Sequence, residues 1–137
     1  RFGRIDAAVN CAGIEGARAN TAEYPEDIFD EVTAVNYKGV FLCMRAEIKQ
    51  MLAQSQRPDG MRGAVVNISS TAGLRAFPEF GAYCGSKWAV LGITRTAALE
   101  HIGDGVRINA ICPATTDTPM VERFAEKWPE WQKKTNA

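Results

Sequence analysis

Short apolar runs alternate with longer amphipathic segments along the chain. Three runs, at residues 5–10, 64–68 and 106–112, are too short for helices and end in polar or turn-forming residues, which is typical of buried strands. The segments between them are long enough for helical crossovers. This alternation predicts an α/β fold, in which a parallel sheet is covered by helices on both faces and the crossover connections are right-handed.

Apolar residues recur at helical spacing in three segments, at about 25–54, 82–102 and 120–131. We expect Pro25 to occupy the first helical position, where its missing N–H does no harm. We expect Gly103 to end the second helix. No internal repeat, linker or low-complexity stretch interrupts this order, which indicates a single domain.

The composition is that of an ordinary soluble domain: the 137 residues include 16 basic and 16 acidic side chains, and 46% are hydrophobic. The balanced charge argues against a nucleic-acid partner, because contacts with phosphates need a clustered basic surplus. A membrane-spanning helix would need an apolar run of about 18 residues, and the sequence contains none. The first residues do not have the pattern of a secretory signal peptide. We therefore expect a cytoplasmic protein.

The four cysteines lie far apart in apolar stretches, at Cys11, Cys43, Cys84 and Cys112. A disulfide framework would be denser and a zinc site would show paired spacing, so we expect reduced, buried thiols. The single histidine, His101, argues against a Ser-His-Asp triad and against a histidine-based metal site. We therefore expect no metal.

Ligands of open parallel sheets bind beyond the carboxyl ends of the strands, which here means residues 10–13, 69–73 and 113–118. Tyr83 and Lys87 stand four residues apart at the start of the second long helix, so their side chains share one face. Because a nearby ammonium favours the phenolate, we expect Lys87 to lower the pKa of Tyr83. The pair is a candidate for proton transfer, although the same spacing is also typical of a solvated helix face.

Two further polar residues belong to the same candidate site. Ser70 follows the middle strand, where its hydroxyl can donate to a substrate oxygen that Tyr83 also meets; the alternative is a serine that only caps the strand end. Asn36 stands inside the first long helix, and together with Gly39 it predicts a helix that is locally opened. The alternative is a tolerated surface asparagine.

Taken in order, six motifs resemble the short-chain dehydrogenase/reductase family. Ser70 also precedes Tyr83 by thirteen residues, which is the usual spacing of that family. The motifs cover nearly the whole chain and lie at residues 10–13, 35–39, 67–70, 83–87, 106–110 and 113–118.

The resemblance implies a Rossmann-like, doubly wound parallel sheet of about seven strands, three of which are present here. It also implies that residues 1–137 are the central and catalytic part of one NAD(P)-binding domain, without a second domain. The activity implied is hydride transfer between NAD or NADP and a small alcohol or ketone. The full-length protein would be a homodimer or homotetramer.

The resemblance also implies roles for single residues. Tyr83 would act as general acid in reduction and general base in oxidation, Lys87 would bind the nicotinamide ribose, and Ser70 would hold the substrate oxygen. Asn36 would order a water through its backbone carbonyl, and the helix at 120–131 would be part of a lid. The implied catalytic residues are Asn36, Ser70, Tyr83 and Lys87, and the implied cofactor contacts are Asn10, Ala12, Gly13, Tyr83, Lys87, Pro113 and Thr118.

The chain departs from the family pattern in three ways. Cys11 replaces an asparagine, Ala114 replaces a glycine, and no glycine-rich pyrophosphate loop is present. We therefore expect a partial sequence with two unpaired apolar strand edges, inactive by itself. Alternatives are a non-catalytic binding protein on the same scaffold, a truncated relic, or a relative of sugar-nucleotide epimerases and dehydratases.

The substrate itself cannot be predicted from the sequence, nor can the choice between NAD and NADP. The aromatic residues near the site suggest an apolar pocket, and packing within a lid is the alternative. These residues are Phe77, Phe80, Trp128 and Trp131.

Overall fold

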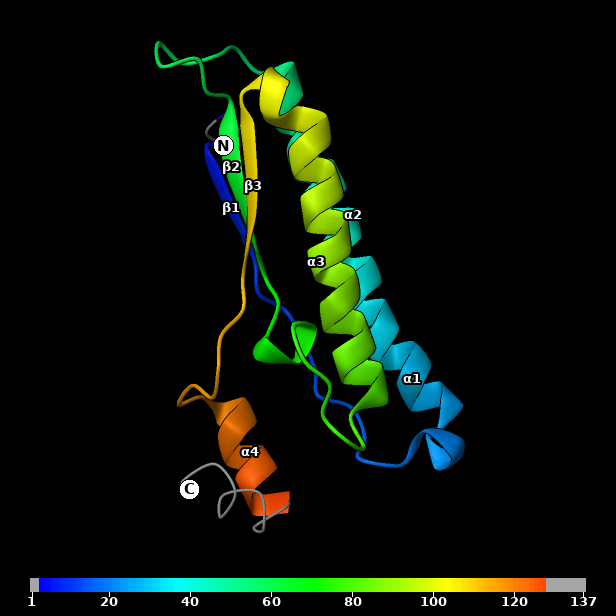
Figure 1. Ribbon diagram of the computed structural model, residues 1–137. Coiled ribbons are helices and arrows are strands. Elements are labelled where there is room, and N and C mark those ends of the chain that lie inside the picture. The colour runs from blue at the N-terminus through cyan, green and yellow to red at the C-terminus, as the bar shows by residue number, and fades with distance from the viewer. Residues whose placement is uncertain (1–2, 128–137) are drawn as a thin grey trace.

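The computed structural model describes residues 3–127, and Figure 1 shows their arrangement. The predicted strands are confirmed as β1 (Ala7–Asn10), β2 (Gly63–Ile68) and β3 (Val106–Ile111). The α-helices are α1 (Glu26–Thr33), α2 (Val40–Ala53), α3 (Gly81–His101) and α4 (Pro119–Lys127). Residues 128–131 of the predicted last helix, with Trp128 and Trp131, lie outside the described residues.

The three strands form one parallel sheet in the order β1-β2-β3, as predicted. Ala7 pairs with Ala64 at the start of β1, and Gly63 pairs with Val106 at the start of β3. The strand ends are therefore aligned. Their carboxyl ends meet at the edge of the sheet that faces α4 and the first turn of α3 (Figure 1).

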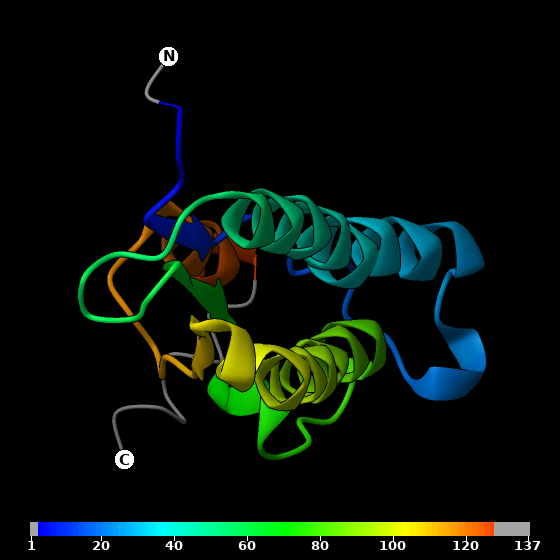
Figure 2. The ribbon, with the colours of Figure 1, turned by 90° about the horizontal axis from the view of Figure 1, so that it is seen from above.

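The predicted helical cover on both faces is wrong for the described residues, because α2 and α3 lie on the same face of the sheet (Figures 1 and 2). Val65, Val106 and Ile108 point to these helices and are buried, whereas Val9 and Ile111 on the opposite face are 61% and 52% exposed. Two right-handed crossovers that step in one direction across a sheet must put both helices on one side. Only a reversal of strand order brings helices to the second face.

The core between the sheet and the helices depends on a glycine. Met51 of α2 is fully buried, and a Cβ added at Gly63 would lie 2.6 Å from its Sδ atom. Gly63 therefore leaves room on the strand for the Met51 side chain. Replacement of that buried side chain by alanine would lower the free energy of unfolding by about 2–5 kcal/mol. The core cluster consists of Met44, Ile48, Met51, Val65, Ala97, Val106 and Ile108.

The opening predicted in the first long helix is confirmed. Between α1 and α2 the backbone forms a π-helical turn at Ala34–Gly39. Asn36 stands inside this turn with its side chain fully buried. Such turns are rare and are frequently found at functional sites.

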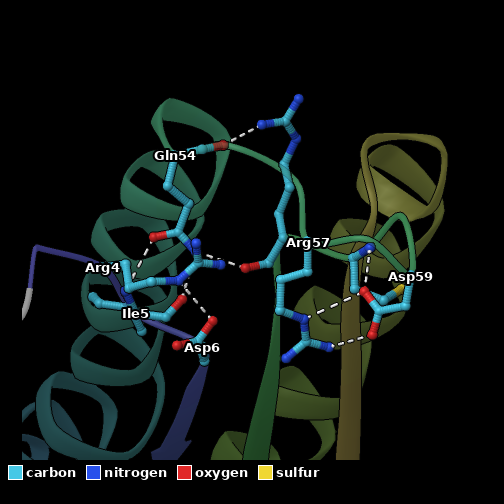
Figure 3. A network of polar contacts seen from close by, with 8 residues as sticks. Arg4, Ile5, Asp6, Gln54, Arg57 and Asp59 are labelled. Carbon is cyan, nitrogen blue, oxygen red and sulfur yellow. Dashed lines mark hydrogen bonds and ion pairs between the residues drawn. The ribbon is translucent and has the colours of Figure 1, made fainter.

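The first strand is shorter than predicted because a side chain replaces the neighbouring strand at its start. The backbone N–H of Ile5 donates to Gln54 Oε1 at 3.0 Å, and Gln54 Nε2 donates back to the Ile5 carbonyl at 2.7 Å (Figure 3). Gln54 Nε2 also donates to the carbonyl of Arg62 just before β2, at 2.6 Å. The Gln54 amide thus links the first strand to the second where the two backbones do not pair.

Two predicted helix ends also need correction. Pro25 precedes the first helical residue with ψ of 127°, and its carbonyl accepts from the N–H of Phe29 at 3.0 Å. At the end of α3, Gly103 lies inside a 3-10 turn, and Gly105 is the residue that leaves the helix, with φ of +76°. A Cβ at Gly105 would approach the Gly60 carbonyl to 2.4 Å, so this position requires glycine on two grounds.

All four cysteines are free, as predicted, but only Cys84 is buried. Cys11 and Cys43 are exposed, which corrects the prediction of buried thiols. Cys11 follows an edge strand, and Cys43 lies on the outer side of α2. Within residues 3–127, no group of side chains has the composition of a metal site, and no helix is long and apolar enough to cross a membrane.

Candidate active site

A cavity of about 210 Å³ lies beyond the carboxyl ends of the strands, where the sequence places the candidate site. Ser70 and Tyr83 contribute polar atoms to its wall, and Glu15 and Arg75 contribute charged groups. The rest is largely apolar and includes Phe77, Phe80, Met120, Val121 and Phe124. The predicted apolar pocket is therefore present in the structure, and packing with the last helix contributes to it.

Ser70 caps the turn that follows β2 and also lines the cavity beside Tyr83. It precedes the 3-10 turn Thr71–Gly73, and its Oγ accepts from the backbone N–H of Ala72 at 3.1 Å. The same side chain lies close enough to Tyr83 to lower the pKa of its phenol. Capping of the turn thus holds the hydroxyl in a fixed place against the phenol.

The phenol of Tyr83 is held in its neutral form. Burial raises the pKa of Tyr83 above its ordinary value of 10.0, the hydrogen bond with Ser70 lowers it, and the charges of Cys84 and Glu15 raise it further. The predicted lowering of this pKa by Lys87 is wrong for this structure. The Lys87 Nζ atom lies 5.6 Å from the centroid of the Tyr83 ring and is directed to a backbone carbonyl instead.

Lys87 carries its ammonium into the interior. Only 4% of the residue is exposed, and Nζ donates to the carbonyl of Ile68 at 3.0 Å. Burial lowers the pKa of Lys87 from its ordinary value of 10.5. A Cβ added at Gly13 would lie 3.4 Å from Nζ, so the turn after β1 passes directly against the ammonium.

Asn36 joins three parts of the chain at this site. Its Oδ1 accepts from the N–H of Ile14 at 2.8 Å, and its Nδ2 donates to the Ile14 carbonyl at 2.8 Å. Nδ2 also donates to Ser86 Oγ at 3.1 Å, while Ser86 donates to the Tyr83 carbonyl at 2.7 Å. The asparagine therefore fixes the turn after β1 against α3, and the prediction of a tolerated surface residue does not apply.

The side chain of Asn10 points into the molecule. Its Nδ2 donates to Glu47 Oε2 at 3.0 Å and to Asn67 Oδ1 at 2.9 Å. Asn67 is fully buried and donates in turn to Thr94 Oγ1 at 2.9 Å. The Asn10 amide thus links β1 to β2 and α2.

The turn after β3 holds the remaining predicted residues. The Pro113 carbonyl accepts from the N–H of Thr71 at 3.0 Å, which links this turn to the 3-10 turn Thr71–Gly73. Thr118 begins α4: its carbonyl accepts from Glu122 and its Oγ1 from the N–H of Val121 at 3.4 Å. Neither Pro113 nor Thr118 lines the cavity, and Ala12 is exposed.

Three residues that matter here have no role in the sequence prediction. Asn67 breaks an otherwise apolar strand, which is a readable sign of a buried polar network. Ser86 lies one position before Lys87, and only its partner across 50 residues, Asn36, shows its use. Glu15 lines the cavity, and no local pattern distinguishes it from other surface acids.

This arrangement has a close counterpart among known proteins. A family model described as short chain dehydrogenase matches residues 1–128. The chain belongs to the short-chain dehydrogenase family. The predicted resemblance is thereby confirmed.

Individual members of the short-chain dehydrogenase family are similar along most of this chain. A 3beta-hydroxysteroid dehydrogenase of Mediterraneibacter gnavus is 45% identical over 123 residues, which are 90% of this chain and 42% of that protein. The structure of NAD⁺-bound xylitol dehydrogenase superposes with a TM-score of 0.82 and 38% identity over 91% of this chain and 46% of that one. The structure of ElxO with NADP bound superposes with a TM-score of 0.81 and 34% sequence identity, over 92% of this chain and 48% of that one.

These similarities confirm the predicted Rossmann-like parallel α/β sheet. The chain spans less than half the length of the three proteins.

Proposed function

We propose that the full-length protein is an NAD(P)-dependent dehydrogenase or reductase that transfers a hydride between the nicotinamide and a small alcohol or ketone. The observation that carries this proposal is the position of Ser70 and Tyr83 on the wall of one cavity, with Lys87 buried behind them. Residues 1–137 then form the central, catalytic part of one domain. In a binding protein or a relic, nothing would require a buried ammonium at this place, whereas a relative of sugar-nucleotide epimerases and dehydratases would use the same tyrosine and lysine.

Tyr83 is the proton donor and acceptor in this proposal. Because burial raises its pKa, the phenol is protonated at neutral pH and ready to donate to a carbonyl oxygen during reduction. Ser70 makes a hydrogen bond with the phenol and faces the same cavity, so both hydroxyls can meet one substrate oxygen. In the oxidative direction the Ser70 hydrogen bond stabilises the phenolate.

Lys87 and Asn36 position the other reactant. The ammonium of Lys87 has one donor on the Ile68 carbonyl, and the backbone of Gly13 passes beside it. In this proposal the ammonium also donates to the ribose of a nicotinamide cofactor. Asn36 keeps the turn in place, and the implied water on its backbone carbonyl remains part of the proposal. Asn10, Ala12, Pro113 and Thr118 would border the same cofactor through backbone or hydroxyl groups.

The cofactor would supply the hydride or accept it, and the protein's residues would orient it and move the proton. One of the similar structures holds NAD⁺ and the other NADP, so both cofactors are proposed. The helix α4 would cover the substrate as part of a lid, because Phe124 stacks on Phe80 at a centroid distance of 5.2 Å. We also propose a cytoplasmic homodimer or homotetramer.

The test is Tyr83→Phe in the full-length protein, with Tyr37→Phe as the matched control outside the cavity lining. Removal of the phenolic proton should lower kcat/KM for ketone reduction by about 10²–10⁴-fold, the range of general acid catalysis. The control should stay within twofold of the wild type, on the order of experimental scatter. Loss of NAD(P)H absorbance measures both. Equal rates in Tyr83→Phe and wild type would overturn the proposal.

A further inference from the structure

Glu79 stands in a strained backbone conformation at the edge of the cavity. Its φ is +69°, and within residues 3–127 it is the only residue other than glycine with a positive φ. A side chain with a Cβ is rarely found in this region, and such positions persist where the surroundings hold them. The next residue is Phe80, which lines the cavity.

Residues 18 and 19, in the segment after β1, contact the backbone and side chain of Glu79; Glu79 and Phe80 are called the corner below. Arg18 Nε lies 2.5 Å from Glu79 Oε2, and the N–H of Ala19 donates to the Glu79 carbonyl at 3.1 Å. Ala19 and Phe80 form an isolated parallel bridge. The ion pair is partly buried, with side chains that are 25% and 34% exposed, so solvent screens it only in part.

The corner controls where the Phe80 ring lies. The Phe80 N–H donates to the Phe77 carbonyl at 3.3 Å, and its own carbonyl accepts from Cys84 at 2.8 Å. Its ring stacks on Phe124 of α4. A change of φ at Glu79 would therefore move one wall of the cavity together with its contact to the last helix.

We propose that Arg18 and Glu79 form a clamp that determines substrate size, because it holds Phe80 against the cavity. The two are positioning residues, which act on the cavity through Phe80. This inference rests on the proposed function for its substrate. If this position served only to form a turn, glycine would be expected, because it adopts the same φ without strain.

The experiment uses the full-length protein with Arg18→Met and Glu79→Gln, which remove the ion pair with little change of size. We expect KM for 4-phenylcyclohexanone to rise about fivefold to tenfold, with kcat within about twofold and acetone reduction unchanged, because only remote binding is lost. Glu79→Gly should show the same rise although it relieves the strain. The charge-reversed pair Arg18→Glu with Glu79→Arg should restore at least half of the affinity.

A second measurement does not depend on catalysis. The dissociation constant of 1-aminoanthracene, a neutral aromatic probe, is followed by fluorescence, and Phe124→Ala shows whether the probe occupies the cavity. Arg18→Met and Glu79→Gln should weaken its binding by a similar factor. Unchanged binding, or a fall of kcat equal for both ketones, would overturn the clamp. A wild type that binds the probe but reduces neither ketone would overturn the proposed function, and the probe titration would still decide the clamp.

Discussion

Among single residues, Lys87 shows most clearly how function and stability oppose each other. An ammonium that is 4% exposed has lost most of its hydration, and one carbonyl at 3.0 Å offsets only part of that loss. An apolar side chain of similar length would fill the same space without this penalty. This penalty supports the proposed role of Lys87 in the site.

Lys87→Met should accordingly raise the stability of the full-length protein at neutral pH, by on the order of 1 kcal/mol, while ketone reduction is lost. Burial lowers the pKa of Lys87 from 10.5 in the folded state. As pH rises through the window below 10.5, the folded wild type releases its proton before the unfolded chain does, so its stability increases. The difference in unfolding free energy between Lys87→Met and the wild type should therefore decrease in that pH window. Urea unfolding at several pH values measures it.

The matched control is Lys38→Met, which removes an exposed lysine from the π-helical turn. Its effect on stability at neutral pH should be small, because the side chain is exposed. A stability difference for Lys87→Met that stays constant up to pH values near 10.5 would contradict the assignment of the shift to burial.

The polar residues differ in how far the sequence predicts them. The hydroxyl of Ser70 and the face shared by Tyr83 and Lys87 follow from local spacing, and the cavity confirms that Ser70 and Tyr83 meet. The direction of the Tyr83 pKa does not follow from spacing. It depends on how deeply the ring is buried and on where the ammonium points, and both are set by packing against β2.

Among the elements, α3 packs tightly on the 3-10 turn Thr71–Gly73. A Cβ at Gly73 would lie 2.6 Å from Ser69 Oγ and 2.8 Å from the Lys87 carbonyl, the two groups that bond each other at 2.9 Å. This contact fixes the height of the helix above the strand ends. The positions of Tyr83 and Lys87 over the cavity follow from it.

Gly73→Ala should therefore destabilise the full-length protein by about 1–3 kcal/mol, the usual effect of overpacking, and should lower kcat/KM. Gly92→Ala is the matched control, because a Cβ there meets nothing within 4 Å on the exposed side of α3. It should stabilise the protein by about 0.5–1 kcal/mol through helix propensity. Thermal unfolding measures both. A neutral Gly73→Ala would show that the turn can move away from the helix.

Some element boundaries are also predictable from local sequence, and others depend on contacts between distant segments. The opening at Ala34–Gly39 is predictable because asparagine and glycine are poor residues inside a helix. The late start of β1 is not predictable, because it depends on Gln54, 49 residues away from Ile5. The helix end at Gly105 instead of Gly103 likewise depends on the close approach of the Gly60 carbonyl.

For the molecule as a whole, the sheet has an uncovered face and two outer strands. In residues 3–127, β1 and β3 each pair on one side only. Val9 and Ile111 are more than half exposed on the face opposite the helices. Unpaired backbone beside apolar side chains invites pairing with other chains.

Residues 1–137 expressed by themselves should therefore associate as concentration rises, as size-exclusion chromatography with light scattering would show. Val9→Lys with Ile111→Lys should reduce this association, because charges at strand edges oppose pairing. Ala76→Lys, in an exposed loop off the sheet, is the control for the added charge. A single monomeric species for the unsubstituted segment at all concentrations would contradict the prediction.

The sequence by itself determines the kinds of element, their order and the parallel sheet, and it predicts the candidate site residues. These depend on periodicity, turn chemistry and short spacings, all of which are local. Only the tertiary structure decides that both long helices share one face, that Asn36 holds Ile14 and Ser86, and that Glu79 is clamped by Arg18. These contacts join segments 22 to 61 residues apart, and their geometry exists only once the chain has packed.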